Sequence, residues 1–488
     1  MQTIKKSLWL FLISSSILVA SPSYQEWLDS QKQEYSSYKK SIDEKFANGL
    51  KKEWETFKSE FNENPYSKPK PKIAPKIEEP IKKIQKPIED LPKVKLAPII
   101  EPQPKEIERP KPIIEQKEQP KAQDKIKFDF FGSKLELSYD KSMNEQSENI
   151  SSPKQIAQYY ENLSKTKYNN TINDINQITN KLSLNDWGRY ILTHNIAKEI
   201  IRSSKNENKN SINCLVWFLL LKQNFDVKIA LDTNKNAILL GNFKENLYQV
   251  SYISIDNKRY FMLTPEGKSS KLSNLQTYDI SYSNNLAAIS PEINTPLAFE
   301  DKIIGKQLSF QYNNKKYQIS AKYNANGIEF LKTFPQTEYD VYLKAKEPPY
   351  LNNLLEQLKT DIKDMNEIEA VNFLLRFTQN AFEYKTDTEQ FSYEKVMLPE
   401  ETIFYPYSDC EDRSIMFSYL VKTILGLKVV ALKFNDHLAT AVKLNAKIDG
   451  DSLIYKNERY YMADPTYINA NVGMTMPQYK NSKFSVIE

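Results

Sequence analysis

The stretch Tyr405-Pro-Tyr-Ser-Asp-Cys-Glu-Asp-Arg-Ser414 leads into an apolar run that ends at Gly426. Ser408 can cap a helix at this point, and Glu411 lies three residues further on, as a capping box requires. Cys410 would then lie in the first helical turn, where free backbone N–H groups and the helix dipole favour a thiolate. The sequence therefore predicts a helix that carries a reactive cysteine at its start.

Two further polar residues fall at the ends of predicted strands. Residues 427–434 and 439–444 favour strands, and His437 lies between them. Residues 460–463 favour a third strand, which Asp464 follows directly. A cysteine, a histidine and an aspartate placed in this way suit nucleophilic acyl transfer. The histidine would deprotonate the thiol and later protonate the leaving group, while the aspartate fixes the imidazole tautomer.

These motifs resemble the transglutaminase-like superfamily of papain-like cysteine hydrolases, in particular a bacterial exported branch. The resemblance rests on residues 405–414, on the strand that follows His437 and on Ala463-Asp-Pro-Thr-Tyr467. It covers about residues 390–488, with weaker support back to about residue 300. It implies a Cys410–His437–Asp464 triad, an α+β fold in which the cysteine helix packs on an antiparallel sheet, and no metal or cofactor. The substrate does not carry over.

Four residues near the cysteine have candidate supporting roles. Tyr405 and Tyr407 either shape a substrate cleft or pack the loop before the helix. Asp412 and Arg413 are expected on the helix surface or in supporting ion pairs, with substrate binding as the alternative. Lone charged residues on a helix are more often solvated than functional, so we assign Asp412 and Arg413 only to a supporting group. The two alternatives for Tyr405 and Tyr407 stay open.

A diverged internal duplication is expected in the chain, with units at residues 124–295 and 300–488. Each unit begins with a hairpin pattern, at 128–139 and at 308–319. Matching segments then follow in the same order, and Arg259-Tyr-Phe-Met-Leu-Thr-Pro265 corresponds to Arg459-Tyr-Tyr-Met-Ala-Asp-Pro465. The offset between matches grows before Cys410, which indicates an extra loop there in the second unit.

The first unit lacks the predicted triad. The same offsets place Lys209, Asn236 and Thr264 opposite Cys410, His437 and Asp464, respectively. The first unit is therefore expected to be a degenerate copy that serves packing or substrate binding. Its Cys214 lies in an apolar run and is expected in the core, and its His194 is expected to be structural.

The N-terminal part of the chain contains three segments outside the two units. Residues 1–20 have the pattern of a secretory signal peptide, with an uncleaved anchor as the alternative, and predict export to the periplasm or cell surface. Residues 24–63 carry a helical aromatic stripe that could form a coiled coil, bind a partner or a membrane surface, or fold back on the chain. Residues 65–123 hold thirteen of the 25 prolines and predict a disordered spacer.

Composition limits the functions that remain. The 67 basic and 62 acidic residues are interleaved, which argues against a nucleic-acid-binding patch. Two cysteines and two histidines are too few for a disulfide scaffold or a zinc site built mainly from these residues. The sequence thus predicts an exported thiol-dependent hydrolase or acyl transferase that acts on a peptide or protein amide, such as one of the cell envelope. The alternative is a non-catalytic envelope scaffold or binding protein.

Overall fold

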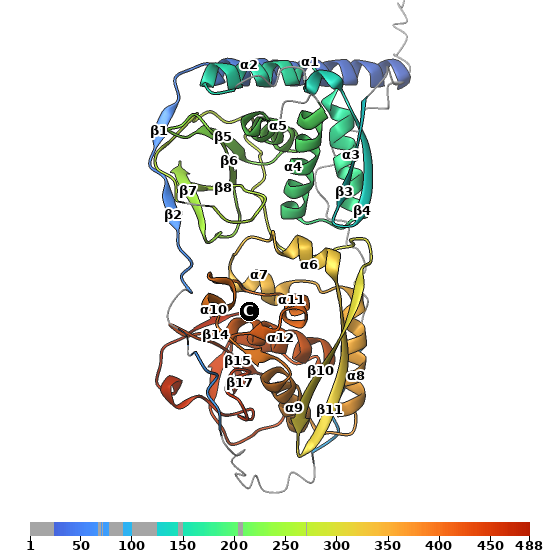
Figure 1. The fold of residues 1–488 in the computed structure, drawn as a ribbon, viewed down its shortest axis with the longest axis vertical. Helices are drawn as coiled ribbons and strands as arrows, with labels where there is room; N and C mark the ends of the chain where they lie inside the picture. The colour runs from blue at the N-terminus through green and yellow to red at the C-terminus, as the bar shows by residue number, and fades with distance from the viewer. Residues whose placement is uncertain are drawn as a thin grey trace, which may run out of the picture.

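The computed structural model describes residues 24–66, 70, 72–77, 91–99, 124–144, 150–203, 208–269 and 271–488. These residues form a mixed α+β structure with antiparallel, curled sheets, arranged as two lobes stacked along the long axis (Figure 1). The upper lobe contains α1 to α5 and the lower lobe contains α6 to α12. The signal-peptide prediction for residues 1–20 falls outside the described residues.

The upper lobe combines five helices with a hairpin and a seven-stranded sheet. The hairpin β3–β4 packs on α3 and α4. The elements are α1 (Tyr24–Leu50), β1 (Glu55–Phe57), β2 (Glu60–Asn62), β3 (Asp124–Phe130), β4 (Ser133–Tyr139), α2 (Pro153–Ser164), α3 (Tyr168–Lys181), α4 (Asp186–Ser203), α5 (Lys209–Lys222), β5 (Val227–Leu231), β6 (Ala237–Asn242), β7 (Val250–Ile255), β8 (Lys258–Met262) and β9 (Leu275–Thr277).

The seven-stranded sheet curls until its two edges nearly meet. Its strand order is β1-β9-β5-β6-β8-β7-β2, so β1 and β2 lie at opposite edges. Only Lys58 and Ser59 separate these two strands in the chain. Three peptide steps span at most about 11 Å. The segment that follows α1 therefore closes the sheet by pairing with β9 on one side and with β7 on the other.

The lower lobe contains a long hairpin, β10–β11, that packs on α8 and α9, and a five-stranded sheet that packs on α12. The elements are β10 (Ile303–Tyr312), β11 (Lys315–Asn324), α6 (Ala325–Leu331), α7 (Tyr339–Lys344), α8 (Asn352–Ile362), α9 (Glu367–Asn380), β12 (Glu383–Tyr384), α10 (Asp387–Phe391), α11 (Pro399–Phe404), β13 (Tyr407–Ser408), α12 (Cys410–Leu420), β14 (Val429–Lys433), β15 (Leu438–Val442), β16 (Ser452–Tyr455), β17 (Glu458–Ala463) and β18 (Ser485–Ile487).

Five strands follow the same order in both lobes. The lower sheet runs β16-β17-β15-β14-β18, and the corresponding part of the upper sheet runs β7-β8-β6-β5-β9. In each lobe a buried helix precedes the first of these strands, α5 before β5 and α12 before β14. Lys209 and Cys410 are the first residues of these two helices.

The two central helices are buried on all sides for different reasons. α5 is apolar through most of its length, and a helix that is apolar all round belongs inside a core. Cys214 lies on it with a relative exposure of 0%, as the sequence predicted for a core cysteine. α12 instead buries three charged residues in its first turn, and it ends in a π-helical turn at Val421–Leu425 followed by Gly426 at φ 65°.

The predicted amphipathic helix over residues 24–63 is shorter than expected. α1 ends at Leu50, and the chain then turns into β1 and β2. Phe46 and Leu50 are buried in the upper core, whereas Tyr35 and Tyr38 remain exposed. The expectation failed because the helical spacing of the aromatic residues continues past Leu50 into a segment that instead pairs with β9 and β7. The C-terminal half of α1 is therefore folded back on the chain.

The predicted disordered spacer over residues 65–123 is also wrong for the parts that the structure describes. The backbone N–H of Val94 donates to Met365 O at 2.9 Å, and that of Ala97 donates to Ile424 O at 2.8 Å. Proline-rich chain cannot build its own ladder, but its remaining N–H groups can donate to other segments. Residues 91–99 therefore dock on the lower lobe, as do residues 72–77.

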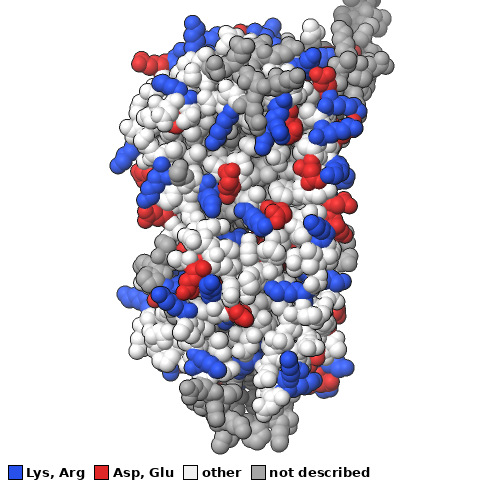
Figure 2. Space-filling view, viewed as in Figure 1, with Lys and Arg blue, Asp and Glu red and all other residues white. Residues whose placement is uncertain are grey.

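Two surface properties bear on partners. None of the described helices is long and apolar enough to cross a membrane. Figure 2 shows basic and acidic side chains interspersed over the visible face, without a broad patch of one sign. This distribution agrees with the interleaved charges of the sequence.

Candidate functional site

Cys410 is the first residue of α12, as the sequence predicted, although the helix is capped differently. The N-cap residue is Asp409 rather than Ser408, and its backbone N–H donates to Asp412 Oδ2 at 3.1 Å. Ser408 Oγ instead accepts a hydrogen bond from Arg413 Nε at 3.1 Å. The helix therefore begins one residue later than predicted, and the carboxylate that accepts from the N-cap N–H belongs to Asp412 rather than to Glu411.

His437 and Asp464 meet in the lower sheet. His437 Nε2 lies 2.8 Å from Asp464 Oδ2, and both side chains are almost fully buried. The backbone N–H of Thr466 donates to Asp464 Oδ1 at 2.9 Å and holds the carboxylate in place. Tyr479 stacks on the imidazole with ring centroids 4.9 Å apart. The other ring nitrogen, Nδ1, is buried and has no hydrogen-bond partner among the described residues.

The cysteine helix lies directly against the histidine strand. Ser414 Oγ, one turn along α12 from Cys410, donates to Leu438 O at 2.9 Å, and Leu438 follows His437 in the chain. α12 and β15 are in close contact. The fold thus gathers the three predicted triad residues into one region of the lower lobe.

The Cys410 thiol is directed toward a carboxylate rather than toward the imidazole. Its Sγ donates to Glu411 Oε2 at 3.0 Å, and the residue has a relative exposure of 1%. Burial, and next the negative charge of Glu411, raise the pKa of the Cys410 thiol well above its usual value. The expected lowering of this pKa at the helix start is therefore wrong for this arrangement, because burial and the charge of Glu411 both raise it.

An acidic pocket adjoins the thiol. It contains five buried carboxylates, and within it sits the ammonium group of Lys70 from the N-terminal segment. Lys70 Nζ lies 2.9 Å from Glu394 and 3.1 Å from Asp409, and it also contacts Glu411. We name as the acidic pocket the set Asp387, Glu394, Asp409, Glu411 and Asp412.

The carboxyl groups of the acidic pocket differ in pKa and therefore in protonation state. Burial acts to raise the pKa of Glu411, but the Lys70 ammonium outweighs it and lowers this pKa to about 2. Burial and neighbouring carboxylates raise the pKa of Asp387 and Asp409 well above their usual range. Glu411 therefore carries the charge that pairs with Lys70, while Asp387 and Asp409 are driven toward the neutral form.

Carboxylate oxygens in this pocket lie close enough together to hold a cation. Asp387, Asp409 and Asp412 form one such group and Asp387, Glu394 and Glu411 another, each with ligand atoms within 4.8 Å of one another. The Lys70 ammonium lies among these groups and pairs with Glu394, Asp409 and Glu411.

The predicted supporting residues hold the structure around the thiol. Asp412 Oδ1 accepts from the Met397 N–H at 2.9 Å, which ties the preceding loop to α12. The Arg413 guanidinium is fully buried and donates to Ser408, to Gln379 O at 3.3 Å and to Phe382 O at 2.7 Å. Both residues are buried, so the helix-surface alternative is wrong, because carbonyl and N–H groups inside the lobe need these partners.

The two predicted tyrosines pack the loop before α12. Tyr405 makes an edge contact with Phe391 at 4.9 Å between ring centroids. Tyr407 pairs with Glu383 in the two-residue parallel ladder of β12 and β13, and Lys385 Nζ lies 4.8 Å from the centre of its ring. Both positions favour the loop-packing alternative over a place beside the thiol.

Sequence reasoning missed two residues that organise the site. Gln379 Nε2 donates to the carbonyls of Asp464, Tyr467 and Ala470, at 3.1, 2.8 and 3.2 Å respectively. Lys70 reaches the site from a segment more than three hundred residues away in the chain. Gln379 falls within the matched segments of the duplication and could have been singled out there, whereas no local signal marks Lys70.

The upper lobe lacks these groups. Lys209 occupies the helix start that Cys410 occupies in the lower lobe. His194 lies on α4 near the Tyr190 ring, and burial lowers the pKa of its imidazole to about 4. It is thus held neutral in a packed setting, consistent with the structural role expected for it.

Comparison of the chain with protein-family models, with curated proteins and with solved structures finds no match.

Proposed function

We propose that the lower lobe is a thiol-dependent hydrolase or acyl transferase that acts on an amide bond through Cys410, His437 and Asp464. The observation that carries the proposal is the His437–Asp464 hydrogen bond with Nδ1 left unpartnered, next to the helix that starts at Cys410. A Cys–His pair needs one ring nitrogen held by a carboxylate and the other available to the thiol. The proposal requires the Cys410 side chain to turn from Glu411 toward that second nitrogen.

The proposed reaction proceeds in two steps. His437 Nδ1 accepts the thiol proton, and Sγ attacks the amide carbonyl carbon to give a tetrahedral intermediate. The C–N bond then breaks, the imidazolium gives its proton to the leaving amine, and a thioester with Cys410 remains. Water or a second amine attacks this thioester, and His437 takes up the proton of the attacking group and returns it to the thiol. Asp464 keeps the imidazole oriented throughout.

Membership of the transglutaminase-like superfamily and the internal duplication belong to the same proposal. The common order of five strands, with a buried helix before each set, supports descent of the two lobes from one unit. The segment with no counterpart in the upper lobe supplies α10 and α11, and with them Asp387 and Glu394 of the acidic pocket. The upper lobe would then be the degenerate copy. Export to the periplasm or cell surface, with envelope amides as substrates, remains a proposal that rests on residues 1–20.

The competing proposal is a non-catalytic binding protein. The raised pKa and the burial of the Cys410 thiol favour it, because a buried neutral thiol is a poor nucleophile. Labelling with a peptide that carries a thiol-reactive electrophile separates the two, with mass spectrometry to locate the adduct. We expect adducts on Cys410 that His437→Ala abolishes and Asp464→Asn strongly reduces, while Cys214→Ala leaves them unchanged.

Cys410→Ala is the negative control of this series, because it lacks the thiol that would be labelled. Its near-UV circular dichroism should match the wild type, since the side chain is lost at a helix start rather than in an apolar core. Labelling of Cys410 at the same rate in the wild type and in His437→Ala would refute the catalytic proposal, and the binding protein would take its place.

A further inference from the structure

A short N-terminal segment crosses the candidate site. We call Lys70 and residues 72–77 the strap. Lys70 enters the acidic pocket beside Cys410, and Lys76 forms a parallel bridge with Ile468, just beyond the Asp464 turn. The strap thus reaches from the start of the cysteine helix to the loop that follows the proposed triad aspartate.

The second half of the strap binds as an added strand. The Ile77 N–H donates to Ile468 O at 3.0 Å, and the Ile468 N–H donates to Pro75 O at 2.8 Å. Asn469 Nδ2 also donates to Ile77 O at 2.8 Å. These contacts involve the strap backbone, so they would accept other sequences in an extended conformation.

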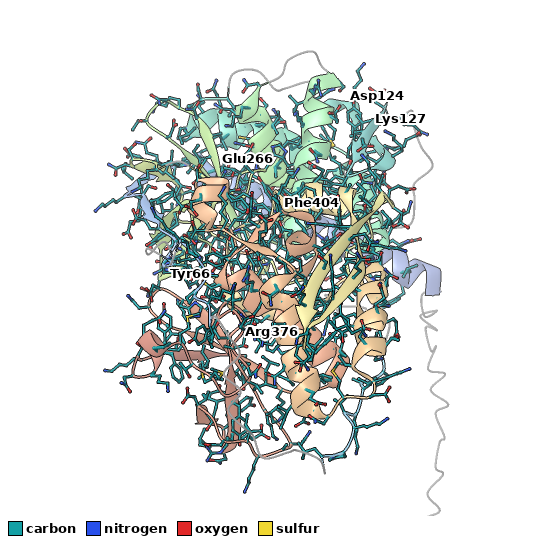
Figure 3. All side chains as sticks on the ribbon, turned by 60° about the horizontal axis from the view of Figure 1, so that its bottom comes forward. Tyr66, Asp124, Lys127, Glu266, Arg376 and Phe404 are labelled. Carbon is teal, nitrogen blue, oxygen red and sulfur yellow. The ribbon has the colours of Figure 1, made fainter. Side chains whose placement is uncertain are left out.

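The edge that receives the strap is held in place by groups outside it. Gln379 fixes the carbonyls on both sides of Ile468, as described above, and its Oε1 accepts from the Asn469 N–H at 3.1 Å. Arg376 on α9, labelled in Figure 3, donates to Asn469 O at 3.1 Å and to Asn471 Oδ1 at 3.0 Å. The edge is therefore built by the lower lobe and does not depend on the strap for its shape.

The first half of the strap is recognised by charge. The Lys70 side chain has a relative exposure of 4%, and three carboxylates contact its ammonium group. Asp409 Oδ1 is fully buried and has no hydrogen-bond partner among the described residues, so the pocket holds a polar atom that Lys70 does not satisfy. Glu411 contacts both Lys70 Nζ and Cys410 Sγ, which places the pocket beside the thiol.

From this combination we propose that the surface from the acidic pocket to Ile468, which the strap covers, is a binding site for an extended peptide that carries a lysine. The strap is its occupant within the same chain and competes with the peptide in trans. A primary ammonium group fills the acidic pocket, and the peptide backbone pairs with Ile468 several residues further on. The proposal rests on the proposed function only in taking this peptide as the substrate.

The experiment measures peptide binding by the full-length chain. The probe is a fluorescein-labelled synthetic copy of residues 66–79, and the control probe has norleucine in place of Lys70. Two variants weaken the strap: Lys70→Met removes the ammonium group, and Ile77→Pro removes the N–H that donates to Ile468 O. Fluorescence anisotropy gives the dissociation constants, and circular dichroism verifies that each variant is folded.

Both variants should bind the lysine probe at least tenfold more tightly than the wild type, because the competing strap is weakened. The norleucine probe should bind at least tenfold more weakly than the lysine probe, as expected for loss of a charge-assisted contact. Failure of both folded variants to bind, or equal binding of the two probes, would overturn the inference. Ile77→Pro leaves the acidic pocket intact, so its affinity for the lysine probe tests the proposal if Lys70→Met does not fold.

Binding and chemistry are separated by a double variant. Lys70→Met combined with Cys410→Ala should bind the lysine probe as tightly as Lys70→Met alone, although it cannot form a thioester. Retained binding together with an absence of electrophile labelling in the Cys410-containing chain would refute the proposed function and leave the peptide site standing. Normal labelling without probe binding would refute the peptide site and leave the proposed function standing.

Discussion

Replacement of Glu411 by Gln should make Cys410 more reactive toward alkylating agents. Glu411 Oε2 lies 3.0 Å from Cys410 Sγ, and after burial its charge is the strongest influence that raises the thiol pKa. Glutamine keeps nearly the same shape and removes the charge. The Lys70 ammonium, which lowers the pKa of this thiol, would then act without its principal counter-charge.

The size of the effect follows from Coulomb's law. Two unit charges at this separation interact by about 5 kcal/mol at an effective dielectric constant of about 20, which is an upper bound. If about a quarter of that energy remains after the effects of the other carboxylates and the glutamine dipole, the thiolate form gains about 1.4 kcal/mol, which is a factor of ten in the thiol–thiolate equilibrium. The thiolate fraction at neutral pH, and with it the alkylation rate, would rise about tenfold.

The assay is the second-order rate of iodoacetamide alkylation against pH, in a Cys214→Ala background that leaves Cys410 as the one thiol. Glu394→Gln is the matched control, because Glu394 also contacts Lys70 but is not among the main influences on the Cys410 pKa. We expect the rate to rise in Glu411→Gln and to change little in Glu394→Gln. An unchanged or lower rate in a folded Glu411→Gln chain would show that this carboxylate does not control the thiol.

Three further predictions concern stability. Burial raises the pKa of Glu400 to about 7 from 4.5, so the folded state favours the protonated carboxyl. The free energy of unfolding is therefore highest below about pH 4.5 and falls as the pH rises through 7. Glu400→Gln should therefore raise the free energy of unfolding by about 1–3 kcal/mol at pH 8 but not at pH 4.5, as urea titrations would test; an equal gain at both pH values would contradict the assignment. Phe46→Ala should lower the free energy of unfolding by about 3–5 kcal/mol, because this ring packs among four aromatic residues. Tyr38→Ala, on the exposed part of α1, should lower it by less than about 0.5 kcal/mol. Equal losses in the two variants would mean that α1 is not docked. Arg413→Met leaves two buried carbonyls without donors, so it should lower the free energy of unfolding by about 3 kcal/mol or more and lower the thermal midpoint of the lower lobe. An unchanged thermal midpoint would contradict the hydrogen bonds described.

Local signals predicted the elements around the site. The cysteine helix begins within one residue of the predicted start and ends at Gly426, and the strands on both sides of His437 lie within the predicted segments to within one residue. These features depend on neighbours in the chain, so one sequence suffices to find them. Cys214 was assigned to the core for the same reason, since its whole segment is apolar.

The contents of the site could not be predicted in the same way. Lys70 and Asp409 are 339 residues apart, and nothing near Lys70 distinguishes it from the other lysines of a proline-rich stretch. The thiol pKa likewise depends on burial and on which charged side chains the fold brings together, and a helix start read from the sequence shows neither. The end of α1 was missed because strand pairing with β7 and β9 outweighed a helical spacing that continued past Leu50.

The sheet closure in the upper lobe also affects how truncated chains would behave. β1 and β2 are made early in synthesis, yet Glu60 contacts Tyr252, which lies 192 residues later in the chain. Closure must therefore wait for the last strands, and pairings of such long range are slow to form. A chain that began near residue 124 would present β7 and β9 as two open edges, and unpaired edges recruit strands from neighbouring molecules. Self-association of such a fragment would then arise from its missing strands and would carry no information about partners of the intact protein.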